Sequence, residues 1–284
     1  MKNNIEDKIS IVITTLGSVS LSNTLDCIIM SNIIIYEVII VIPNNFNFNF
    51  NINKYFKIIN IKIKYLKKSG QVFQRLEGFK IVTGDYVLQL DDDIEFNETM
   101  IFELYNTLKK SGNACVSPMF VDKLNLKSIY LNSFNFYNKL LNFIFYFNFK
   151  INEGQITKNG IAYGVITENR IIPVDWVPGG CVLHLRKNLL NFNYFPYNGK
   201  AYMEDLFHSF YLKKMNIKLL INTYSKCRII NPKYEVLKNN IFRNKYQENK
   251  IRKEYYKLTN LNLFLFYWTC FIQLIISFFK YLKY

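Results

Sequence analysis

The stretch Tyr86 to Phe96 reads YVLQLDDDIEF and joins a run of apolar residues directly to three aspartates. An apolar run of this length is typical of a buried strand. Open α/β sheets bind ligands beyond the carboxyl ends of their strands, so acids that follow a strand are placed to meet a ligand. In an extended chain Asp91 and Asp93 point to one side and Asp92 to the other. The stretch predicts a ligand-binding strand end, with a solvated turn as the alternative.

Two carboxylates on one side of a strand end suit a hard divalent cation. Mg²⁺ and Mn²⁺ prefer oxygen ligands and bridge protein carboxylates to substrate phosphates. A calcium-binding EF-hand is disfavoured, because the glycine and the closing glutamate of its loop are missing. Asp91 and Asp93 are therefore predicted metal ligands.

Short β-rich runs alternate with helical stretches around this strand. The run Ile9–Thr14 is followed by a helical stretch at Leu21–Met30 and by a second β-rich run at Glu37–Pro43. Strand, helix, strand without alternating polar residues indicates an α/β fold with a mostly parallel sheet covered by helices on both faces. Further strands are expected at Ile58–Leu66, Ala114–Val121 and Ile217–Ile221, and further helices at Gln71–Ile81, at Asn97–Lys110 and from about Glu204.

The chain is strongly basic, and its charge is unevenly placed. Lys and Arg exceed Asp and Glu by 36 to 21 in 284 residues, which gives a net charge of +15. Between Thr223 and Asn260 there are ten basic and three acidic residues. This segment precedes an apolar C-terminus, so the charge favours an anionic membrane surface over nucleic acid as the partner.

The C-terminal stretch Leu261–Phe279 is almost continuously apolar, with lysines on both flanks. A membrane span needs about 20 apolar residues, so this stretch is borderline in length. It fits a helix lying in the membrane interface at least as well as a full span. Packing on the rest of the chain and oligomerisation are the alternatives.

The cysteines and the N-terminus indicate a reducing compartment. Five cysteines are scattered without a CxxC pair, which argues against a disulfide framework or a zinc site. The polar start MKNNIEDKIS does not resemble a signal peptide. We expect a cytoplasmic protein, peripheral to or tail-anchored at the inner face of the cell membrane.

Several motifs occur in the order found in one enzyme family. The chain resembles the inverting GT-A glycosyltransferases of family 2 over roughly residues 8 to 222. This resemblance implies a Rossmann-like GT-A domain at 1–222, with a donor half at 1–125 and an acceptor half at 126–222, and a basic, apolar tail at 223–284. The motifs are IVITTLG (11–17), EVIIVIP (37–43), QRLEGFKIVTGDYVLQLDDD (74–93), VDWVPGGCVLHLR (174–186) and MEDLFHSFYLKKMNIKLL (203–220).

The resemblance implies a donor site that binds a nucleotide sugar and Mg²⁺ or Mn²⁺. In the family, the first acid of the DxD motif contacts the donor ribose and the last binds the metal, here Asp91 and Asp93. The arginine that precedes Gly78 by three residues lies near the donor. The residues so implied in donor binding are Thr14, Thr15, Arg75, Asp91, Asp92, Gly179 and Gly180.

The resemblance also makes Asp205 the general base, with Glu204 beside it. The N–H groups at the start of a helix favour a carboxylate and would keep it ionised, ready to accept a hydroxyl proton. The alternative for both acids is an ordinary helix cap. Trp176, just before the PGG sequence, is a candidate for stacking on an acceptor sugar, with burial in the core as the alternative.

The chain departs from the family pattern at two places. Many relatives have an aspartate that contacts the base after the second strand, whereas this chain has Asn44. Many also supply a metal-binding histidine after the helix that begins with the Glu-Asp pair, which is Glu204 and Asp205 here. The corresponding region of this chain contains no histidine. His208, one helical turn from Glu204, is a candidate third ligand or a structural residue, and water with the diphosphate can complete the shell instead.

The predicted function is transfer of a sugar from a nucleotide-diphosphate donor to a hydroxyl of a glycan or lipid-linked acceptor, with inversion. Assembly of bacterial surface polysaccharide is the expected setting. A sugar nucleotidyltransferase is one alternative, although TTLGSVS (14–20) lacks the basic residue of its phosphate loop. A non-catalytic basic protein that binds membranes or nucleic acid is the other, and it leaves the ordered acidic motifs unexplained.

Overall fold

The computed structural model describes residues 2–3, 5–135, 140, 143, 151–195, 197, 201–230 and 241–282. The chain divides into two compact units, one of Met1–Ser128 with Thr167–Pro232 and one of Ile129–Ile166 with Lys233–Tyr284. The predicted boundary after residue 222 falls inside a continuous strand, Lys218–Ile229, and residues 129–166 group with the C-terminal helices. The predicted split at 125 and 222 therefore differs from the observed units.

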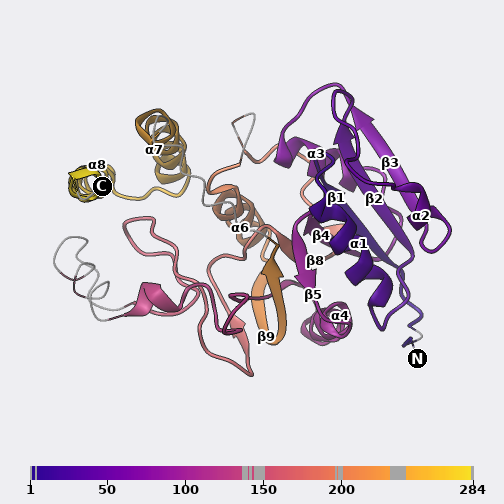
Figure 1. The fold of residues 1–284 in the computed structure, drawn as a ribbon. Coiled ribbons are helices and arrows are strands. Elements are labelled where there is room, and N and C mark those ends of the chain that lie inside the picture. The colour runs from indigo at the N-terminus through magenta and orange to yellow at the C-terminus, as the bar shows by residue number, and fades with distance from the viewer. Residues whose placement is uncertain are drawn as a thin grey trace. The chain divides into compact units, whose positions relative to one another are not determined.

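The first unit is built on one nine-stranded sheet (Figure 1). Its order is β3-β2-β1-β4-β8-β6-β9-β5, with β7 paired to β9. The first four strands in sequence are parallel, and β4 pairs antiparallel with β8. The strands are β1 (Ile9–Thr14), β2 (Glu37–Pro43), β3 (Ile61–Leu66), β4 (Tyr86–Asp91), β5 (Ile94–Phe96), β6 (Ala114–Phe120), β7 (Ile171–Pro173), β8 (Cys181–Leu185) and β9 (Lys218–Ile229).

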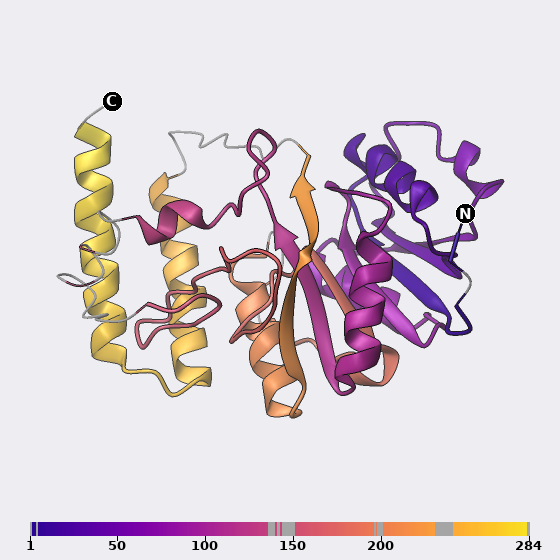
Figure 2. The same cartoon turned by 90° about the horizontal axis from the view of Figure 1, so that it is seen from below.

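Helices cover both faces of this sheet, which explains its apolar strands. Every residue of β1 and β2 is buried. Helices α1 (Ser20–Met30) and α4 (Met100–Ser111) pack on the face that carries Ile11 and Leu88. Figure 2 shows α4 lying along β6 and β9. Helices α3 (Gln71–Phe79) and α6 (Glu204–Lys214) contact the other face, and the predicted α/β architecture is confirmed.

The strand order places two carboxyl ends side by side at the centre of the sheet. Strands β2 and β3 extend from one side of β1, and β4 pairs with its other side. Successive strands are therefore added first on one side of β1 and then on the other. Open α/β sheets bind ligands at such a change of strand order. Thr14 is the register partner of Asp91 across this junction.

Helix α3 can approach the sheet closely because of Gly78. A Cβ atom at this position would meet the side chains of Val12 and Val41. The contact of Gly78 with Val12 and Val41 sets the distance between α3 and the strands β1 and β2. It thereby fixes the position of Arg75, which lies one turn earlier on the helix.

The segment Asn44–Lys57 contains a short helix. Helix α2 (Asn53–Phe56) buries Tyr55, whose ring meets the edge of Phe50. The hydroxyl of Tyr55 donates to Asp26 at 2.9 Å and so ties α2 to α1.

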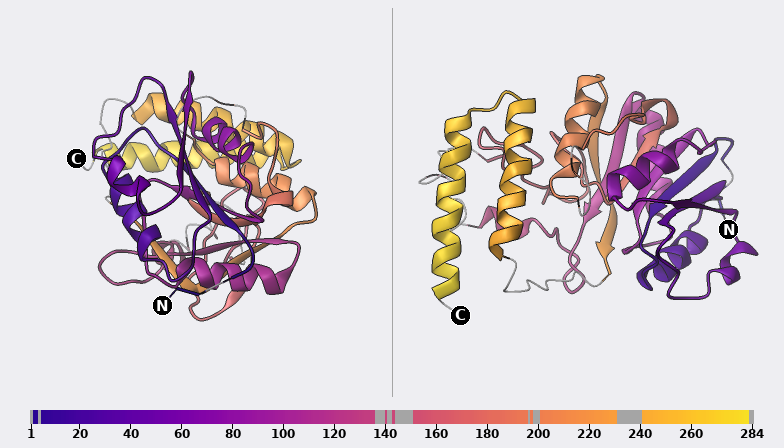
Figure 3. Two further views of the ribbon diagram at one scale, coloured as in Figure 1. Left: turned by 90° about the vertical axis from the view of Figure 1, so that its right-hand side faces the viewer. Right: turned by 90° about the horizontal axis from the view of Figure 1, so that it is seen from above.

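The second unit contains α7 (Ile241–Leu258) and α8 (Leu263–Leu282), which lie side by side (Figure 3). Tyr256 of α7 donates to the carbonyl of Asn159, and the Asn159 amide lies 3.3 Å from Thr269 of α8. The predicted tail is thus a helix packed on its neighbours. Among the helices of the described ranges, none has the length and apolarity needed to cross a bilayer. Most of the Phe/Tyr-rich stretch 132–147 lies outside the described residues.

Candidate active site

Three aspartates and two threonines line one cavity at the β1–β4 junction. The cavity has a volume of about 570 Å³. The structure brings together five of the residues predicted to bind the donor or metal, Thr14, Thr15, Asp91, Asp92 and Asp93, and adds Leu16, Ser18, Ser69, Gly70, Gln71 and Gln74 to the lining.

Asp92 is held by the end of the neighbouring strand. Its carboxylate accepts a hydrogen bond from the Thr15 hydroxyl. Burial and the charge of Asp91 raise the pKa of Asp92 to about 6, although the Thr15 bond acts in the opposite direction. Asp92 therefore stabilises the β1–β4 junction and leaves its two neighbours to face other partners.

Asp93 lacks a compensating charge. Burial, followed by repulsion from Asp91 and Asp92, raises the pKa of Asp93 to about 7. Within the described ranges, no side chain forms an ion pair with it. A partly buried carboxylate beside two others gains most from a cation, and Mg²⁺ needs only one or two protein carboxylates when phosphates complete its shell. The donor set at Asp91 and Asp93 fits such an ion.

Arg75 joins the two acidic motifs. Its guanidinium is 1% exposed and donates to Asp91 Oδ1 at 2.8 Å and to Glu204 Oε1 at 2.6 Å. Burial alone would lower the pKa of Arg75, but the carboxylates of Glu204 and Asp91 outweigh burial and raise this pKa above its ordinary value. The sequence places this arginine near the donor. In the structure Arg75 pairs with Asp91, which lines the cavity, and with Glu204, which does not.

Two glutamines of α3 complete the arrangement and were not singled out from the sequence. Gln71 Nε2 lies 3.1 and 3.2 Å from the two oxygens of Asp91. Gln74 Nε2 donates to the carbonyls of Thr15 and Val41 at 3.1 and 2.9 Å, at the ends of β1 and β2. Gln71 lies four residues before Arg75 and Gln74 four residues before Gly78, and this helical spacing was the available signal.

Gly179 and Gly180 make room for carboxylates. A Cβ atom at Gly179 would collide with the carboxylate of Glu204, and one at Gly180 would lie 3.1 Å from Asp91 Oδ2. The backbone N–H of Asp91 donates to the Gly180 carbonyl at 2.8 Å, and Gln89 donates to the Gly179 carbonyl. In this structure the two glycines lie against the acids, and their implied place beside the sugars stays a prediction.

Glu204 and Asp205 are the first two residues of helix α6. Met203 stands before them with φ of 57°, a left-handed conformation that is costly for a residue with a side chain. No side-chain cap bond is formed at Met203, and Glu204 is turned to Arg75. Glu204 therefore does not act as a cap, whereas Asp205 accepts a hydrogen bond from the Leu206 N–H in the first turn of the helix at 3.0 Å.

Asp205 is the more accessible acid of the pair, and its charge is not favoured. Burial and the charge of Glu204 raise the pKa of Asp205 to about 7, despite the 3.0 Å bond from the Leu206 N–H. The N–H groups at the helix start lower the pKa of Asp205, as expected, but burial and the neighbouring acid outweigh them. Such a pKa suits a base that works near neutral pH.

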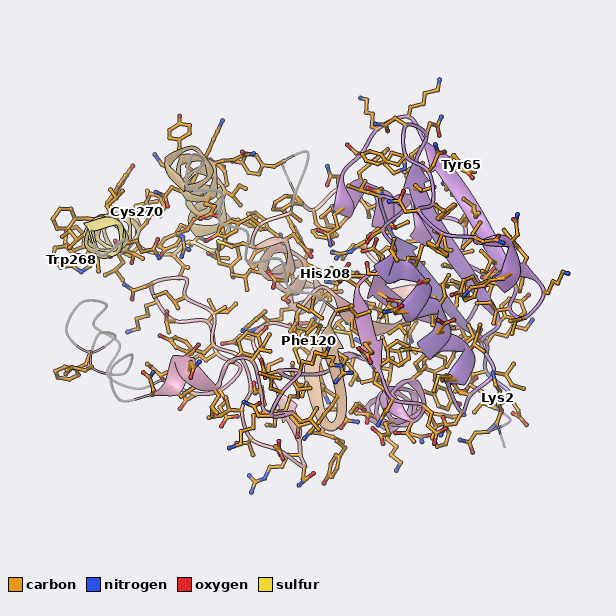
Figure 4. The ribbon with its side chains drawn as sticks, in the orientation of Figure 1. Lys2, Tyr65, Phe120, His208, Trp268 and Cys270 are labelled. Carbon is orange, nitrogen blue, oxygen red and sulfur yellow. The ribbon has the colours of Figure 1, made fainter. Side chains whose placement is uncertain are left out.

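His208 lies in the interior and not at the aspartates. It is labelled in Figure 4 and is 1% exposed, with its ring 5.3 Å from that of His184 and 5.1 Å from that of Tyr194. Burial, His184 and Arg75 hold its pKa well below the ordinary value. No group of three or more His, Cys, Asp or Glu residues that could hold a metal is present in the part of the chain that the structure describes. The predicted set of Asp91, Asp93 and His208 is not brought together.

Trp176 and Asn44 are not among the residues that line the cavity of the three aspartates. Trp176 is 6% exposed, in keeping with the core alternative. Asn44 lines a second cavity of about 930 Å³ together with Asn45, Leu66, Lys67, Lys68, Ser69 and Phe73. Ser69 lines both cavities, so the second one adjoins the first at the carboxyl ends of β2 and β3.

A family model matches this half of the protein. Residues 10–166, more than half of the chain, match "Glycosyl transferase family 2". The chain belongs to this family. The match includes the cavity and the three aspartates, whereas Gly179, Gly180 and α6 lie beyond it.

One curated relative and two solved structures extend the comparison. The "Ribosomal operon-associated A protein" of Euglena longa is 27% identical over 234 residues, which are 75% of this chain and 43% of that protein. GalNAc-T7, crystallised with UDP, GalNAc and Mn²⁺, aligns with a TM-score of 0.55 and 14% identity over 79% of this chain and 44% of its own. Residues 1–349 of TarS from S. aureus align with a TM-score of 0.52 and 14% identity, over 79% and 61% of the two chains.

These comparisons bear on family and fold. This chain spans less than half the length of the Euglena longa protein and of GalNAc-T7. The fold is that of the GT-A glycosyltransferases, with a mostly parallel central sheet flanked by helices, as predicted.

Proposed function

We propose that this family 2 protein transfers a sugar from a nucleotide-diphosphate donor to a hydroxyl of an acceptor, with inversion at the anomeric carbon. The observation that carries the proposal is the buried Arg75, which pairs with Asp91 at the cavity and with Glu204 beside Asp205. This one side chain links an acid of the cavity to the residue next to the candidate base. A single displacement needs both groups on one reacting centre.

Donor binding is assigned to the cavity at the β1–β4 junction. Thr14, Thr15, Asp91 and Asp92 line it, and Gln71 holds the Asp91 carboxylate. Asp93, with Asp91, would hold Mg²⁺ or Mn²⁺, and when bound the ion would neutralise negative charge on the leaving diphosphate. The crystal structure of GalNAc-T7 contains Mn²⁺. Binding of a divalent ion by the present chain is a proposal.

Asp205 is the proposed general base. Deprotonated Asp205 takes the proton of the acceptor hydroxyl as its oxygen attacks the anomeric carbon from the face opposite the diphosphate. Glu204, fixed by Arg75, supports the position of its neighbour and does not itself take the proton. Trp176 remains a proposed acceptor contact, with 6% of its surface exposed.

The proposed acceptor is a glycan or lipid-linked saccharide at the inner face of a membrane, as in bacterial surface polysaccharide synthesis. The net charge of +15 and the exposed aromatic residues of α8 support a membrane partner over nucleic acid. A cytoplasmic, peripheral location follows from this proposal.

The test is release of nucleoside diphosphate by the purified full chain with a panel of nucleotide sugars and Mn²⁺. We expect metal-dependent release with at least one donor. Asp205→Asn should lose turnover by about a hundredfold or more while donor binding, measured by calorimetry, is kept. Asp7→Asn, which changes an acid paired with Lys109 away from the cavity, is the matched control. Release of pyrophosphate would favour a nucleotidyltransferase, and loss of donor binding in Asp205→Asn would assign this acid to the donor.

A further inference from the structure

Unpartnered polar atoms collect around Arg75. Within the described part of the chain, the buried side-chain atoms without a hydrogen-bond partner include Arg75 Nε, Tyr194 Oη, Glu204 Oε2, both ring nitrogens of His184 and Nδ1 of His208. Arg75 and Glu204 are bonded to each other, and the three rings are in contact. Buried polar atoms are costly to leave unpaired, so a cluster of them in one place calls for a function.

The rings hold Tyr194 over the first turns of α6. Tyr194 is 3% exposed and lies nearly parallel to His208, with ring centroids 5.1 Å apart and an interplanar angle of 30°. His208 is four residues after Glu204 on α6, and its other contact, His184, belongs to β8. Burial and the charge of Arg75 lower the pKa of His184 to about 3, so these rings add no positive charge that would compete for Glu204.

The unpartnered atoms are chemically complementary. Arg75 Nε–H can only donate, Glu204 Oε2 as a carboxylate oxygen can only accept, and a tyrosine hydroxyl can do both. Burial and the charge of Glu204 raise the pKa of the Tyr194 hydroxyl, whereas Arg75 lowers it through its charge and through side-chain hydrogen bonding, which places this hydroxyl close to both groups.

We propose that Tyr194 is a positioning residue whose hydroxyl accepts a hydrogen bond from Arg75 and donates one to the second oxygen of Glu204 in the working enzyme. Glu204 is then held at both oxygens, by Arg75 and by Tyr194. Because Asp205 is the next residue on α6, a fixed Glu204 limits rotation of the helix start and keeps the base aimed at the acceptor. The catalytic part of this inference rests on the proposed function, whereas the hydrogen bonds themselves do not.

A double-mutant cycle tests the proposal in two ways. Tyr194→Phe keeps the ring on His208 and removes only the hydroxyl, and Glu204→Gln changes its partner. We expect coupled shifts in the urea midpoint, so that the double variant is less destabilised than the sum of the single variants. In donor turnover, Tyr194→Phe should lower kcat by about tenfold with KM nearly unchanged, and should cost little more in the Glu204→Gln background.

The control is Tyr105→Phe, which removes a hydroxyl bonded to Asp7 at 2.6 Å and should leave kcat unchanged. Additive midpoint shifts, together with kcat losses that multiply, would overturn the proposal. If the wild type turns over no nucleotide sugar, the proposed function fails and the urea cycle still decides the Tyr194 bond. If either variant fails to fold, a high-resolution crystal structure decides: Tyr194 Oη beyond hydrogen-bond distance of both Arg75 and Glu204 refutes it.

Discussion

At the residue scale, a guanidinium buried as deeply as that of Arg75 requires partners, because water no longer stabilises its charge. Asp91 and Glu204 supply two negative charges at 2.8 and 2.6 Å. Removing one member of a buried ion group leaves the others unpaired, which costs more than the pair itself contributes.

Arg75→Ala should therefore lower the free energy of unfolding by about 3–5 kcal/mol, since it leaves two carboxylates without a cation. Arg228→Ala is a matched control, because Arg228 pairs with Glu95 at 2.6 Å but with both side chains about one-third exposed, at 29% and 36%. An exposed pair contributes about 0–1 kcal/mol. Urea denaturation measures the free energy of unfolding of both variants. Equal losses of this free energy would contradict the argument that burial makes the Arg75 contacts the stronger ones.

The pKa of Asp205, raised to about 7, gives the reaction a pH dependence of definite sign. A raised pKa means that the carboxyl is protonated below about pH 7 and cannot accept a proton there. At saturating donor, acceptor and Mn²⁺, kcat should fall about tenfold per pH unit below 7 and level off above it.

The metal must be saturating in this measurement, because Asp93 titrates in the same range. Mn²⁺ affinity is measured separately and should also weaken below about pH 7, since the ion binds the ionised carboxylate. A kcat that stays flat from pH 5 to 8 would rule out Asp205 as the base.

At the scale of elements, buried Glu37 ties three strands together at the end of the sheet opposite the cavity. It accepts hydrogen bonds from Ser10 of β1 at 2.7 Å, from Lys62 of β3 at 2.7 Å and from both backbone and side chain of Thr83 before β4. Burial alone would raise the pKa of Glu37, but these bonds outweigh it and lower the pKa to about 2.

Glu37→Gln should lower the free energy of unfolding at pH 7 by about 1–3 kcal/mol through loss of charged hydrogen bonds. Because the pKa is lowered, the contribution of Glu37 is present above about pH 4.5 and is lost as pH falls toward 2. Urea midpoints from pH 7 to 3 should fall less steeply in the variant than in the wild type. Glu168→Gln, at an exposed pair with Lys226, should change neither the midpoint nor its slope.

At the scale of the whole molecule, the second unit presents a stripe of exposed apolar residues on α8. Phe264, Tyr267, Phe271 and Leu274 are 68%, 55%, 52% and 47% exposed and follow a spacing of three and four residues. Lys253 of α7 lies 5.4 Å from the ring of Tyr267. The opposite face of α8, with Phe266 and Thr269, is buried.

Aromatic residues beside a lysine favour the interface of an anionic bilayer. Replacing Phe264, Tyr267 and Phe271 with serine should therefore abolish flotation with phosphatidylglycerol vesicles, while Met30→Ser and Ile58→Ser, at exposed apolar sites of the first unit, should not. Flotation that persists in the triple variant, or a change from dimer to monomer in light scattering, would assign the stripe another role.

The sequence by itself determined the α/β architecture and the carboxylates at the end of β4. Both depend on local patterns: an apolar run reports a strand covered on two faces, and acids directly after it must lie at the sheet edge. The helix beginning at Glu204 was predictable from local pattern, whereas the grouping of Thr14, Thr15 and Asp91–Asp93 was implied by the family resemblance.

Only the tertiary structure decided what these residues face. Arg75 precedes Glu204 by 129 positions, so no local pattern reports their 2.6 Å contact. The neutral interior position of His208, the carboxylates against Gly179 and Gly180, and the raised pKa of Asp205 depend on burial and on charges from distant elements. Electrostatic energies are set by distance and solvent exposure, and those quantities exist only once the chain is folded.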